Sequence, residues 1–248
     1  MKKVLFDAEF YAYRHCMAAV EDQRWGEEDW VQVFRHGEAL NNMRAQLVGL
    51  IEKFPEHKLI LCRGKGRNFR KDVYADYKAN RRNRRPPGGY SEFLGRMNTM
   101  AVHLGAEVWR LEGVEGDDII GLFLEKDDVV VSGDKDMRTL AGGHLNPDGK
   151  ITHVTEGEAN RALYEQILVG DQADGYKGCP KVGEVAARKL LAQCRTEMHM
   201  WDKVLGAYLS AGLSESYALQ MARCARILRR GEYDISKQVP LLWEPPVT

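Results

Sequence analysis

The sequence predicts an α/β fold in which a mostly parallel central sheet is flanked by helices. Short apolar runs that are typical of buried strands alternate, along the first half of the chain, with segments whose apolar residues recur at helical spacing. Acidic residues stand just after several of the apolar runs. Because open parallel sheets bind ligands at the carboxyl ends of their strands, this second pattern predicts a functional site along that edge.

The expected elements follow one another with few interruptions. The segment 21–37 is polar and holds two tryptophans, so we expect a loop or short helix there, with the tryptophans packed against the protein. No clear linker is present, and the expected division lies near Gly170, between a core of residues 1–170 and a helical region of residues 171–248. We expect strands at 2–6, 58–62, 106–111 and 129–132, and a turn at 146–149 followed by a short strand. Helices are expected to begin at 8 and 115 and to span 40–54, 91–104, 159–168, 185–191, 201–209 and 217–228.

Composition places the chain among soluble globular proteins. Of its 248 residues, 44% are hydrophobic and 29% are charged, and no apolar run approaches the ~20 residues that cross a bilayer. The N-terminal segment reaches Asp7 after three apolar residues, too few for a signal peptide, so we expect a cytoplasmic protein, in the host cytoplasm if it is phage-encoded. The five cysteines are scattered, which favours reduced thiols. The formal net charge is zero, but the charges are strongly segregated along the chain.

Eight carboxylates are candidates for one acidic cluster. Singly, each has an ordinary structural explanation, since acids are favoured at helix N-termini and Asp7 is suited to capping a helix. Together they need another reason, because carboxylates within a few Å repel one another unless they share protons or hold cations. Their oxygens suit Mg²⁺ or Mn²⁺, and two such ions ~4 Å apart would activate water against a phosphodiester. The candidate metal ligands are Asp7, Glu115, Asp117, Asp118, Asp134, Asp136, Asp171 and Asp174.

A basic segment follows the second expected strand. Residues 63–85 contain ten Lys or Arg and two acids, a local charge of +8. If 69–81 is a helix, Arg70, Tyr74, Lys78 and Arg81 share one face, where cations would pair with phosphates and tyrosines stack on bases; a solvated charged surface is the alternative. Lys78 and Arg81 could also stabilise the charge of a phosphoryl transition state. The other residues that we assign to nucleic-acid binding here are Arg63, Lys71, Tyr77 and Arg82.

Gly178 and Gly183 bracket a tight turn that leads into the helix expected at 185–191. Such a turn directs main-chain amides and a helix N-terminus at a phosphate, with Lys181 between the glycines, and it would bind DNA independently of base sequence. An ordinary helix hairpin is the alternative. Neither a P-loop nor a Ser-His-Asp or Cys-His arrangement is evident, so no other catalytic motif competes with a metal site.

At these residues the chain resembles the structure-specific 5′ nucleases, a family that includes flap endonucleases and the 5′-nuclease domains of bacterial DNA polymerases. The similarity is closest to phage 5′→3′ exonucleases. It runs from Val4 to about Leu191, with weaker similarity through ARILRRGEY. Five motifs in the family's order carry it, namely the strand ending at Asp7, FRKDVYADYKANR, VEGDD, SGDKD and GDQADGYKGCPKVG.

The resemblance implies a PIN-like core, a basic helical arch over residues 63–89 and a helix-three-turn-helix element at 178–183 that binds duplex DNA and holds K⁺. It also implies a Mg²⁺-dependent enzyme with two metals that hydrolyses DNA from 5′ ends or at flaps, in phage-type replication, recombination or primer removal. RNA–DNA hybrids are a further expected substrate. The expected state is a monomer, with a polymerase or a single-strand-binding protein as partner.

One position departs from the family's pattern. After the second strand the family places an aspartate, in a pattern resembling FDGKG, whereas this chain reads LCRGKG with Arg63, and we expect no nearby acid to replace it. The change could weaken binding of the first metal, and Arg63 could instead meet a phosphate or pair with a carboxylate. One alternative to a working DNA nuclease is therefore a DNA-binding accessory protein with weakened catalysis. Another is an RNA-cleaving nuclease of a related metal-dependent fold.

Overall fold

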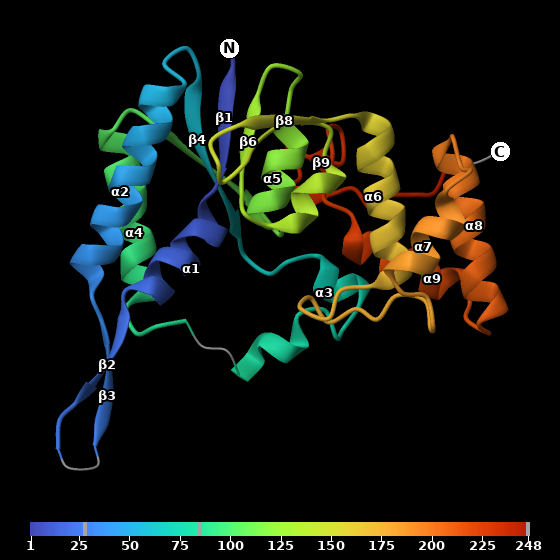
Figure 1. Cartoon of the computed structure of the whole chain (residues 1–248), viewed down its shortest axis with the longest axis horizontal. Coiled ribbons are helices and arrows are strands. Elements are labelled where there is room, and N and C mark those ends of the chain that lie inside the picture. The colour runs from blue at the N-terminus through green and yellow to red at the C-terminus, as the bar shows by residue number, and fades with distance from the viewer. Residues whose placement is uncertain (27–28, 84–85, 247–248) are drawn as a thin grey trace.

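The computed structural model describes residues 1–26, 29–83 and 86–246, with the side chains of residues 82 and 83 outside the description. Its centre is a six-stranded sheet with the order β5-β4-β1-β6-β7-β8 (Figure 1). Strand β8 runs antiparallel to β7, and the other pairs are parallel, which confirms the predicted sheet. The strands are β1 (Lys3–Asp7), β4 (Lys58–Lys65), β5 (Glu107–Glu112), β6 (Val129–Val131), β7 (Gly142–Leu145) and β8 (Ile151–Val154).

Strand β1 lies in the middle of the sheet and is buried along its whole length, because both faces of the sheet are covered. Its side chains alternate between two cores, with Val4 and Phe6 in one and Leu5 in the other. The register pairs Asp7 with Cys62 of β4, and β6 pairs with β1 on its other side. The carboxyl ends of these three strands therefore meet at one edge of the sheet.

Helices cover the two faces of the sheet (Figure 1). Helices α1 (Ala8–Ala18), α2 (His36–Lys53) and α4 (Tyr90–His103) bury their apolar stripes against one face. Helix α5 (Gly116–Phe123) packs against the other face, together with residues from the C-terminal part of the chain. Within the described residues, no helix combines the length and apolarity needed to cross a membrane.

A second core lies beside the sheet and is built mainly from helices, with loop residues such as Tyr77, Tyr176 and Cys179. Helix α6 begins with a capping box formed by Thr155 and Glu158. Its Tyr164 packs in the same core as Trp201 of α8. The division near Gly170 stays a prediction, and it falls at the C-cap of a helix that shares this core. The helices are α6 (Glu156–Val169), α7 (Glu184–Leu191), α8 (Glu197–Ser210) and α9 (Glu215–Ala225).

The polar segment between α1 and α2 forms a β-hairpin, so the expected loop or short helix is wrong. Its strands are β2 (Val20–Arg24) and β3 (Trp30–Phe34), and it projects from the body of the protein (Figure 1). Trp25 is 75% exposed and Trp30 65%, so the prediction that they pack against the protein is also wrong. Backbone pairing orders this segment without a buried apolar face, which explains why hydrophobic periodicity did not reveal it.

The basic segment does not form the single helix over residues 69–81 that would place four of its residues on one face. Helix α3 spans only Arg70–Val73, and a separate 3₁₀ helix follows at Ala79–Asn83. Between them, Lys78 has a φ of 54°, a left-handed conformation that interrupts the helical path. Its backbone N–H donates to the carbonyl oxygen of Asp174 at 2.6 Å. This contact with a distant loop therefore determines the local backbone conformation. The four residues considered for one helical face do not share one; they are Arg70, Tyr74, Lys78 and Arg81.

The C-terminal tail, in which the sequence showed no readable chemistry, is packed onto the helical core. A two-stranded ribbon of β9 (Tyr233–Asp234) and β10 (Val239–Pro240) follows α9. Trp243 then meets Trp201 of α8 in an edge-to-face contact, with 5.6 Å between the ring centroids. Arg223 of α9 donates to the carbonyl oxygen of Trp243 at 3.0 Å, so the tail is held by both packing and hydrogen bonding.

A buried ion pair joins the basic segment, α5 and the chain that follows α9. Arg70 is 1% exposed and donates two hydrogen bonds to the carboxylate of Asp118, at 2.7 and 2.6 Å. Its guanidinium also donates to the carbonyl oxygens of Cys224 and Arg226, at 3.1 and 2.6 Å. Asp118 in turn accepts from the backbone N–H of Leu228 at 3.0 Å. The pair thus links segments that are far apart in the sequence.

This pairing corrects two sequence predictions. Arg70 was expected to contact DNA, but its guanidinium is buried and fully engaged by protein oxygens. Asp118 was expected to hold a metal, but it is 0% exposed and both of its oxygens accept hydrogen bonds from the protein. Both residues therefore stabilise the fold.

Replacing Arg70 with Met keeps much of the side-chain volume but leaves the Asp118 carboxylate buried without its cation. We expect Arg70→Met to lower the free energy of unfolding by about 3–5 kcal/mol, the usual cost of removing one partner of a buried pair. Chemical denaturation at pH 7 measures this decrease. Arg67→Met is the matched control, because the ion pair between Arg67 and Asp72 is exposed and worth about 0–1 kcal/mol. Equal decreases in the two variants would contradict the role of Arg70.

Candidate active site

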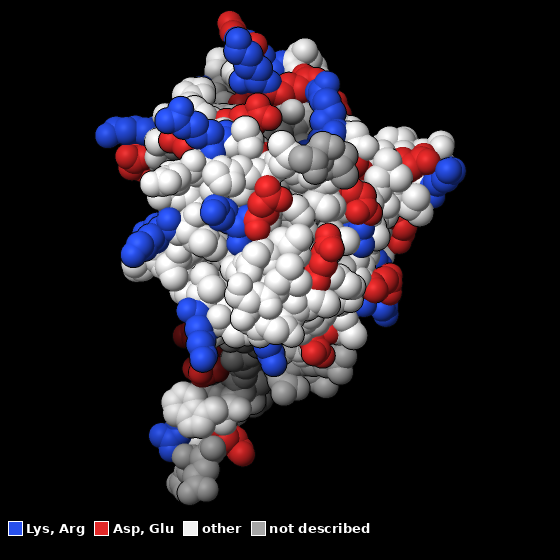
Figure 2. Space-filling model, turned by 90° about the vertical axis from the view of Figure 1, so that its right-hand side faces the viewer, with Lys and Arg blue, Asp and Glu red and all other residues white. Residues whose placement is uncertain are grey.

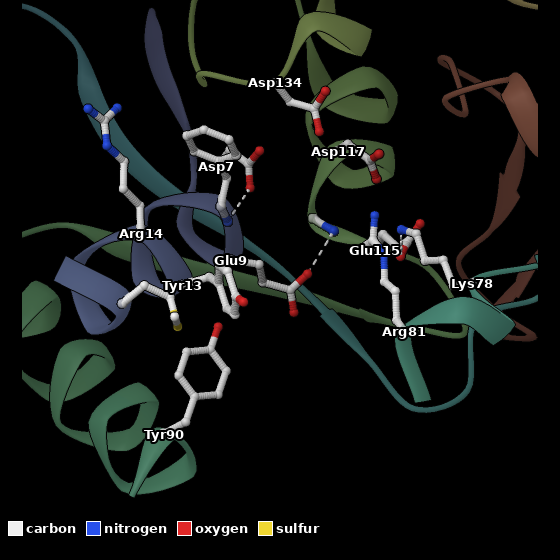
Figure 3. A pocket seen from close by; sticks show the side chains of 13 residues that line it. Asp7, Glu9, Tyr13, Arg14, Lys78, Arg81, Tyr90, Glu115, Asp117 and Asp134 are labelled. Carbon is white, nitrogen blue, oxygen red and sulfur yellow. Dashed lines mark hydrogen bonds and ion pairs between the residues drawn. The ribbon is translucent and has the colours of Figure 1, made fainter. Parts of the chain in front are cut away.

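A cavity of about 670 Å³ opens at the carboxyl edge of β1 (Figure 3). Its walls come from α1, α4, the first turn of α5, the segment after β6 and the basic segment. Four of the predicted metal ligands line it, together with both cations that were predicted to act on a phosphate. The charged residues of its lining are Asp7, Glu9, Glu115, Asp117 and Asp134, and Arg14, Lys78 and Arg81.

Asp7 occupies the junction between β1 and α1. One of its oxygens accepts from the backbone N–H of Phe10 at 3.1 Å and caps the helix, while the other accepts from the Ser132 hydroxyl at 2.7 Å. Burial, together with the charges of Glu9 and Asp134, raises the pKa of Asp7 to about 6 despite these hydrogen bonds. The residue is therefore both a helix cap and part of the cavity wall.

The start of α5 supplies two more carboxylates. Glu115 stands at the N-cap position and accepts a hydrogen bond from the Tyr77 hydroxyl at 2.9 Å. Burial opposes its ionised form, but Lys78 and Arg70 outweigh burial and lower the pKa of Glu115 to about 2. Burial and the neighbouring carboxylates raise the pKa of Asp117 well above its usual range. The pKa values of Glu115 and Asp117 are thus shifted in opposite directions within one helical turn, because Lys78 and Arg70 neutralise mainly Glu115.

A second group of acids follows β6 and continues into the loop after α6. Asp134 lines the cavity and accepts from the backbone N–H of Asp136 at 2.9 Å. Burial, with Asp134 and Asp171 nearby, raises the pKa of Asp136 to about 6, and its Oδ1 has no hydrogen-bond partner among the described residues. Asp171 forms an ion pair with Lys135 at 3.0 Å. Asp134 and Asp171 therefore disfavour the ionised form of Asp136, although Asp136 and Asp171 do not line the cavity.

The basic segment is docked against the loop that holds Asp174. Lys78 forms an ion pair with Glu115 and lies 3.6 Å from a carboxylate oxygen of Asp174. Arg81 forms an ion pair with Asp174 as well. The Tyr77 hydroxyl lies within hydrogen-bond distance of both acids, at 2.9 and 3.1 Å. Tyr77 is 3% exposed, so its expected stacking on DNA bases is not what the structure shows.

The other residues of the basic segment that were predicted to bind DNA lie in different environments. Arg63 is buried, at 7% exposure, and donates to the Asn98 side chain, so it is not placed to meet a phosphate. Lys71 is exposed. Tyr74 is half-buried and meets Tyr217 in an edge-to-face contact. The side chain of Arg82 lies outside the described residues.

The loop between α6 and α7 contains the glycine-bracketed turn. A Cβ atom on Gly178, whose φ is 65°, would lie 2.4 Å from the backbone nitrogen of Gly170, so the close approach requires glycine. Lys181 is exposed and has a φ of 64°. Gly183 is the N-cap of α7 and has no side chain to bind the first-turn amides. The turn is confirmed, while its helix-three-turn-helix character stays a prediction.

The donor chemistry of the cavity fits a hard divalent cation. The acids that line it offer carboxylate oxygens. Burial, together with neighbouring carboxylates, raises the pKa values of Asp7 and Asp117, so a bound cation would stabilise their ionised forms. In the described ranges, however, no group of three or more His, Cys, Asp or Glu side chains is already arranged to hold a metal. Lys78 pairs with Glu115 instead. Holding a cation therefore requires local movement of these side chains.

Glu9 is a residue of the cavity that sequence reasoning missed. It lies in the first turn of α1 and accepts from the backbone N–H of Gly116 at 3.4 Å. Burial and the charge of Glu115 raise the pKa of Glu9, and Arg63 partly opposes them. Its position two residues after Asp7 was the available signal, but an acid in a first helical turn has an ordinary explanation. The fold therefore brings Arg63 near an acid that lies far from it in the sequence.

Comparisons with known proteins agree with the geometry. The family described as 5′-3′ exonuclease, N-terminal resolvase-like domain, matches residues 2–166. An exodeoxyribonuclease of Enterobacteria phage T3 and an exonuclease of Escherichia phage T7 are each 27% identical to the chain, over 98% of its length and 92% and 93% of theirs. The solved structure of T5 5′-exonuclease with bound zinc has a similar fold, with a TM-score of 0.65 and 14% identity over 91% of this chain and 93% of that one. Because the family match spans more than half of the sequence, the chain belongs to the 5′-3′ exonuclease family.

Proposed function

We propose that this chain is a metal-dependent nuclease that hydrolyses DNA phosphodiester bonds from 5′ ends and at flaps. The observation that carries the proposal is the cavity in which five carboxylates meet Lys78 and Arg81 at the carboxyl edge of the sheet. Carboxylates hold divalent cations, and the two basic side chains match the charge of a phosphate. Membership of the 5′-3′ exonuclease family and similarity to two phage exonucleases support the same reaction.

The proposed cations are Mg²⁺ or Mn²⁺, with two as the working number. When bound, such ions lower the pKa of an attacking water and offset the charge on the leaving oxygen. Solved T5 structures with metal ions, one of which also contains DNA, support this proposal. The residues proposed to hold the first ion are Asp7, Glu115, Asp117 and Asp134, with Asp136, Asp171 and Asp174 around the second.

Lys78 and Arg81 are proposed to bind the phosphate that reacts. Both side chains are held by acids, Lys78 by Glu115 and Arg81 by Asp174. When these acids hold cations, their attraction for the two basic side chains falls, and Lys78 and Arg81 become free to contact phosphate oxygens. Donors fixed at that place would then stabilise the charge that develops on the phosphate during the reaction.

The DNA is proposed to lie over the basic segment and the loop between α6 and α7. Lys71 and Lys181 would pair with phosphates, Tyr74 would meet a base, and the first-turn amides after Gly183 would bind a phosphate without reading sequence. The face on the α8 side suits DNA less well, because Figure 2 shows Lys and Arg interspersed with Asp and Glu there. A helix-three-turn-helix element with K⁺, action on RNA–DNA hybrids, a monomeric state and a polymerase or single-strand-binding partner remain part of this proposal.

Incubating 5′-labelled duplex and flap DNA with the protein and Mg²⁺ or Mn²⁺ tests the proposed reaction. We expect release of label that EDTA abolishes and that Asp134→Asn slows at least ~100-fold, because the loss of one charge-stabilising group from such a site costs several kcal/mol. Asp148→Asn is the matched control, since Asp148 lies in an exposed turn. Tight DNA binding without metal-dependent cleavage would favour the accessory-protein alternative, and faster cleavage of matched RNA would favour an RNA nuclease.

The raised pKa of Asp136 predicts a pH-dependent stability. Its pKa is about 6 in the folded protein against an ordinary value of 3.8, so the stability it contributes is full below pH ~3.8 and is lost as the pH rises through 6. A pKa of about 6 against 3.8 corresponds to at most ~3 kcal/mol, of which solvent screening leaves a part. We therefore expect Asp136→Asn to raise the melting temperature of the metal-free protein at pH 7.5 by at least about 2–4 °C, the shift that ~1 kcal/mol produces in a chain of this size. At pH 4 the increase should be much smaller. Thermal unfolding in EDTA measures both values, and equal increases at the two pH values would argue against charge as the cause.

Lys78→Ala separates transition-state stabilisation from DNA binding. We expect this variant to slow single-turnover cleavage ~100-fold or more while the Kd for duplex DNA rises less than ~10-fold. Lys71→Ala is the comparison. It should weaken binding and lower the slope of log Kd against log salt concentration by about 0.9 for the one phosphate that it no longer neutralises, with little change in the single-turnover rate. Fluorescence anisotropy at several salt concentrations gives the binding values. Matching decreases in rate and affinity at Lys78 would show that it only holds the DNA.

A further inference from the structure

Glu9 reaches from α1 into the cavity that Asp7 also lines. The chain enters α1 directly after Asp7, which places Glu9 in the first helical turn. Figure 3 shows its side chain extending toward the start of α5, where the backbone N–H of Gly116 donates to it at 3.4 Å. The carboxylate therefore lies between the two segments that supply Asp7 and Glu115.

A buried cation accompanies Glu9. The strand register pairs Asp7 with Cys62, so Arg63 follows beside the start of α1. Arg63 is 7% exposed and donates to the Asn98 side chain at 3.1 Å, while its Nε has no hydrogen-bond partner within the described part of the chain. Burial lowers the pKa of Arg63, and the charge of Glu9 partly offsets this effect by favouring the ionised form of Arg63, although no ion pair within 4 Å links the described side chains of the two residues. A guanidinium this deeply buried requires such a counter-charge.

Two glycines hold the end of β4 against the start of α5. A Cβ atom on Gly64 would lie 2.2 Å from the carbonyl oxygen of Val114, and one on Gly116 would lie 2.8 Å from a carbonyl oxygen of β4. Any side chain at either position would push the strand and the helix apart. Arg63 directly precedes the first glycine and Glu9 binds the N–H of the second, so this close approach sets where the cation and the acid lie.

We propose that Glu9 is a further carboxylate of the metal-binding cavity and that Arg63 is the residue that positions it. This inference rests on the proposed nuclease function. Position 63, where the 5′-nuclease pattern has an aspartate, then contributes no ligand of its own. The acid comes instead from the neighbouring junction of β1 and α1, and would bind a divalent cation directly or through a water on that cation. Arg63 acts on the cavity through Glu9 and does not contact DNA.

Binding of Mn²⁺ to the intact, metal-free protein, followed by electron paramagnetic resonance, tests this inference without DNA or cleavage. We expect Glu9→Gln to weaken Mn²⁺ binding at least ~10-fold, within the 10–100-fold range for groups that support a metal site. Arg63→Met should weaken binding to a similar degree, and the double variant should bind no more weakly than Glu9→Gln alone, because the two residues act together. Glu52→Gln, on the exposed side of α2, is the matched control and should bind as the unchanged protein does.

The same experiment distinguishes failure of the inference from failure of the proposed function. If Asp134→Asn weakens Mn²⁺ binding while Glu9→Gln does not, the role of Glu9 is overturned and the nuclease proposal stands. If neither variant alters binding, the metal site itself is elsewhere and both proposals fail. Arg63→Lys keeps the buried charge and should bind Mn²⁺ better than Arg63→Met. Arg63→Met should also leave the salt dependence of DNA binding unchanged. A decrease of about 0.9 in the slope of log Kd against log salt concentration would show that Arg63 contacts a phosphate, and it would overturn the positioning role.

Discussion

The buried pair of Arg70 and Asp118 is the constraint on which the site depends. Asp118 accepts the backbone N–H of Glu115 at 3.0 Å, so the pair fixes the turn of α5 that faces the cavity. A desolvated ion pair persists only when its remaining donors and acceptors are satisfied, and the carbonyl oxygens of Cys224 and Arg226 meet that need. The acids at the start of α5 are therefore held in place by the last turn of α9 and the residues that follow it, more than a hundred residues later in the sequence.

The cavity contains one acid whose charge is offset by cations of the protein and other acids whose charge is not. Lys78 keeps Glu115 ionised, whereas burial favours the protonated forms of Asp7 and Asp117. The basic segment is held against the loop at Asp174 by the ion pairs of Lys78 and Arg81 with the Asp174 carboxylate. The position of the basic segment therefore depends on the charge of the cavity, because a change in the charge of Glu115 or Asp174 weakens the ion pairs that hold Lys78 and Arg81.

Periodicity predicted the sheet and most of its helices, because the alternation of apolar runs is a local property of the sequence. The position of Asp134 after β6 was readable for the same reason. The roles of residues that depend on contacts with distant parts of the sequence were not readable. Arg70 reads as one more cation in a basic run, yet its partners lie 48 and 156 positions away. Glu9 reads as an ordinary first-turn acid, and only the packing of β4 against α5 shows that it faces the cavity.

Asp7 has two roles, as the cap of α1 and as part of the cavity wall, and this restricts which substitutions are tolerated there. The same carboxylate closes the amino end of α1 through Phe10 and faces the cavity, so any replacement there acts on folding and on chemistry together. Asn retains an acceptor for the cap while removing the charge, whereas Ala removes both. Substitution by Ala at this position therefore changes both the helix cap and the charge of the cavity, and loss of activity in Asp7→Ala alone would not show which of the two changes caused it.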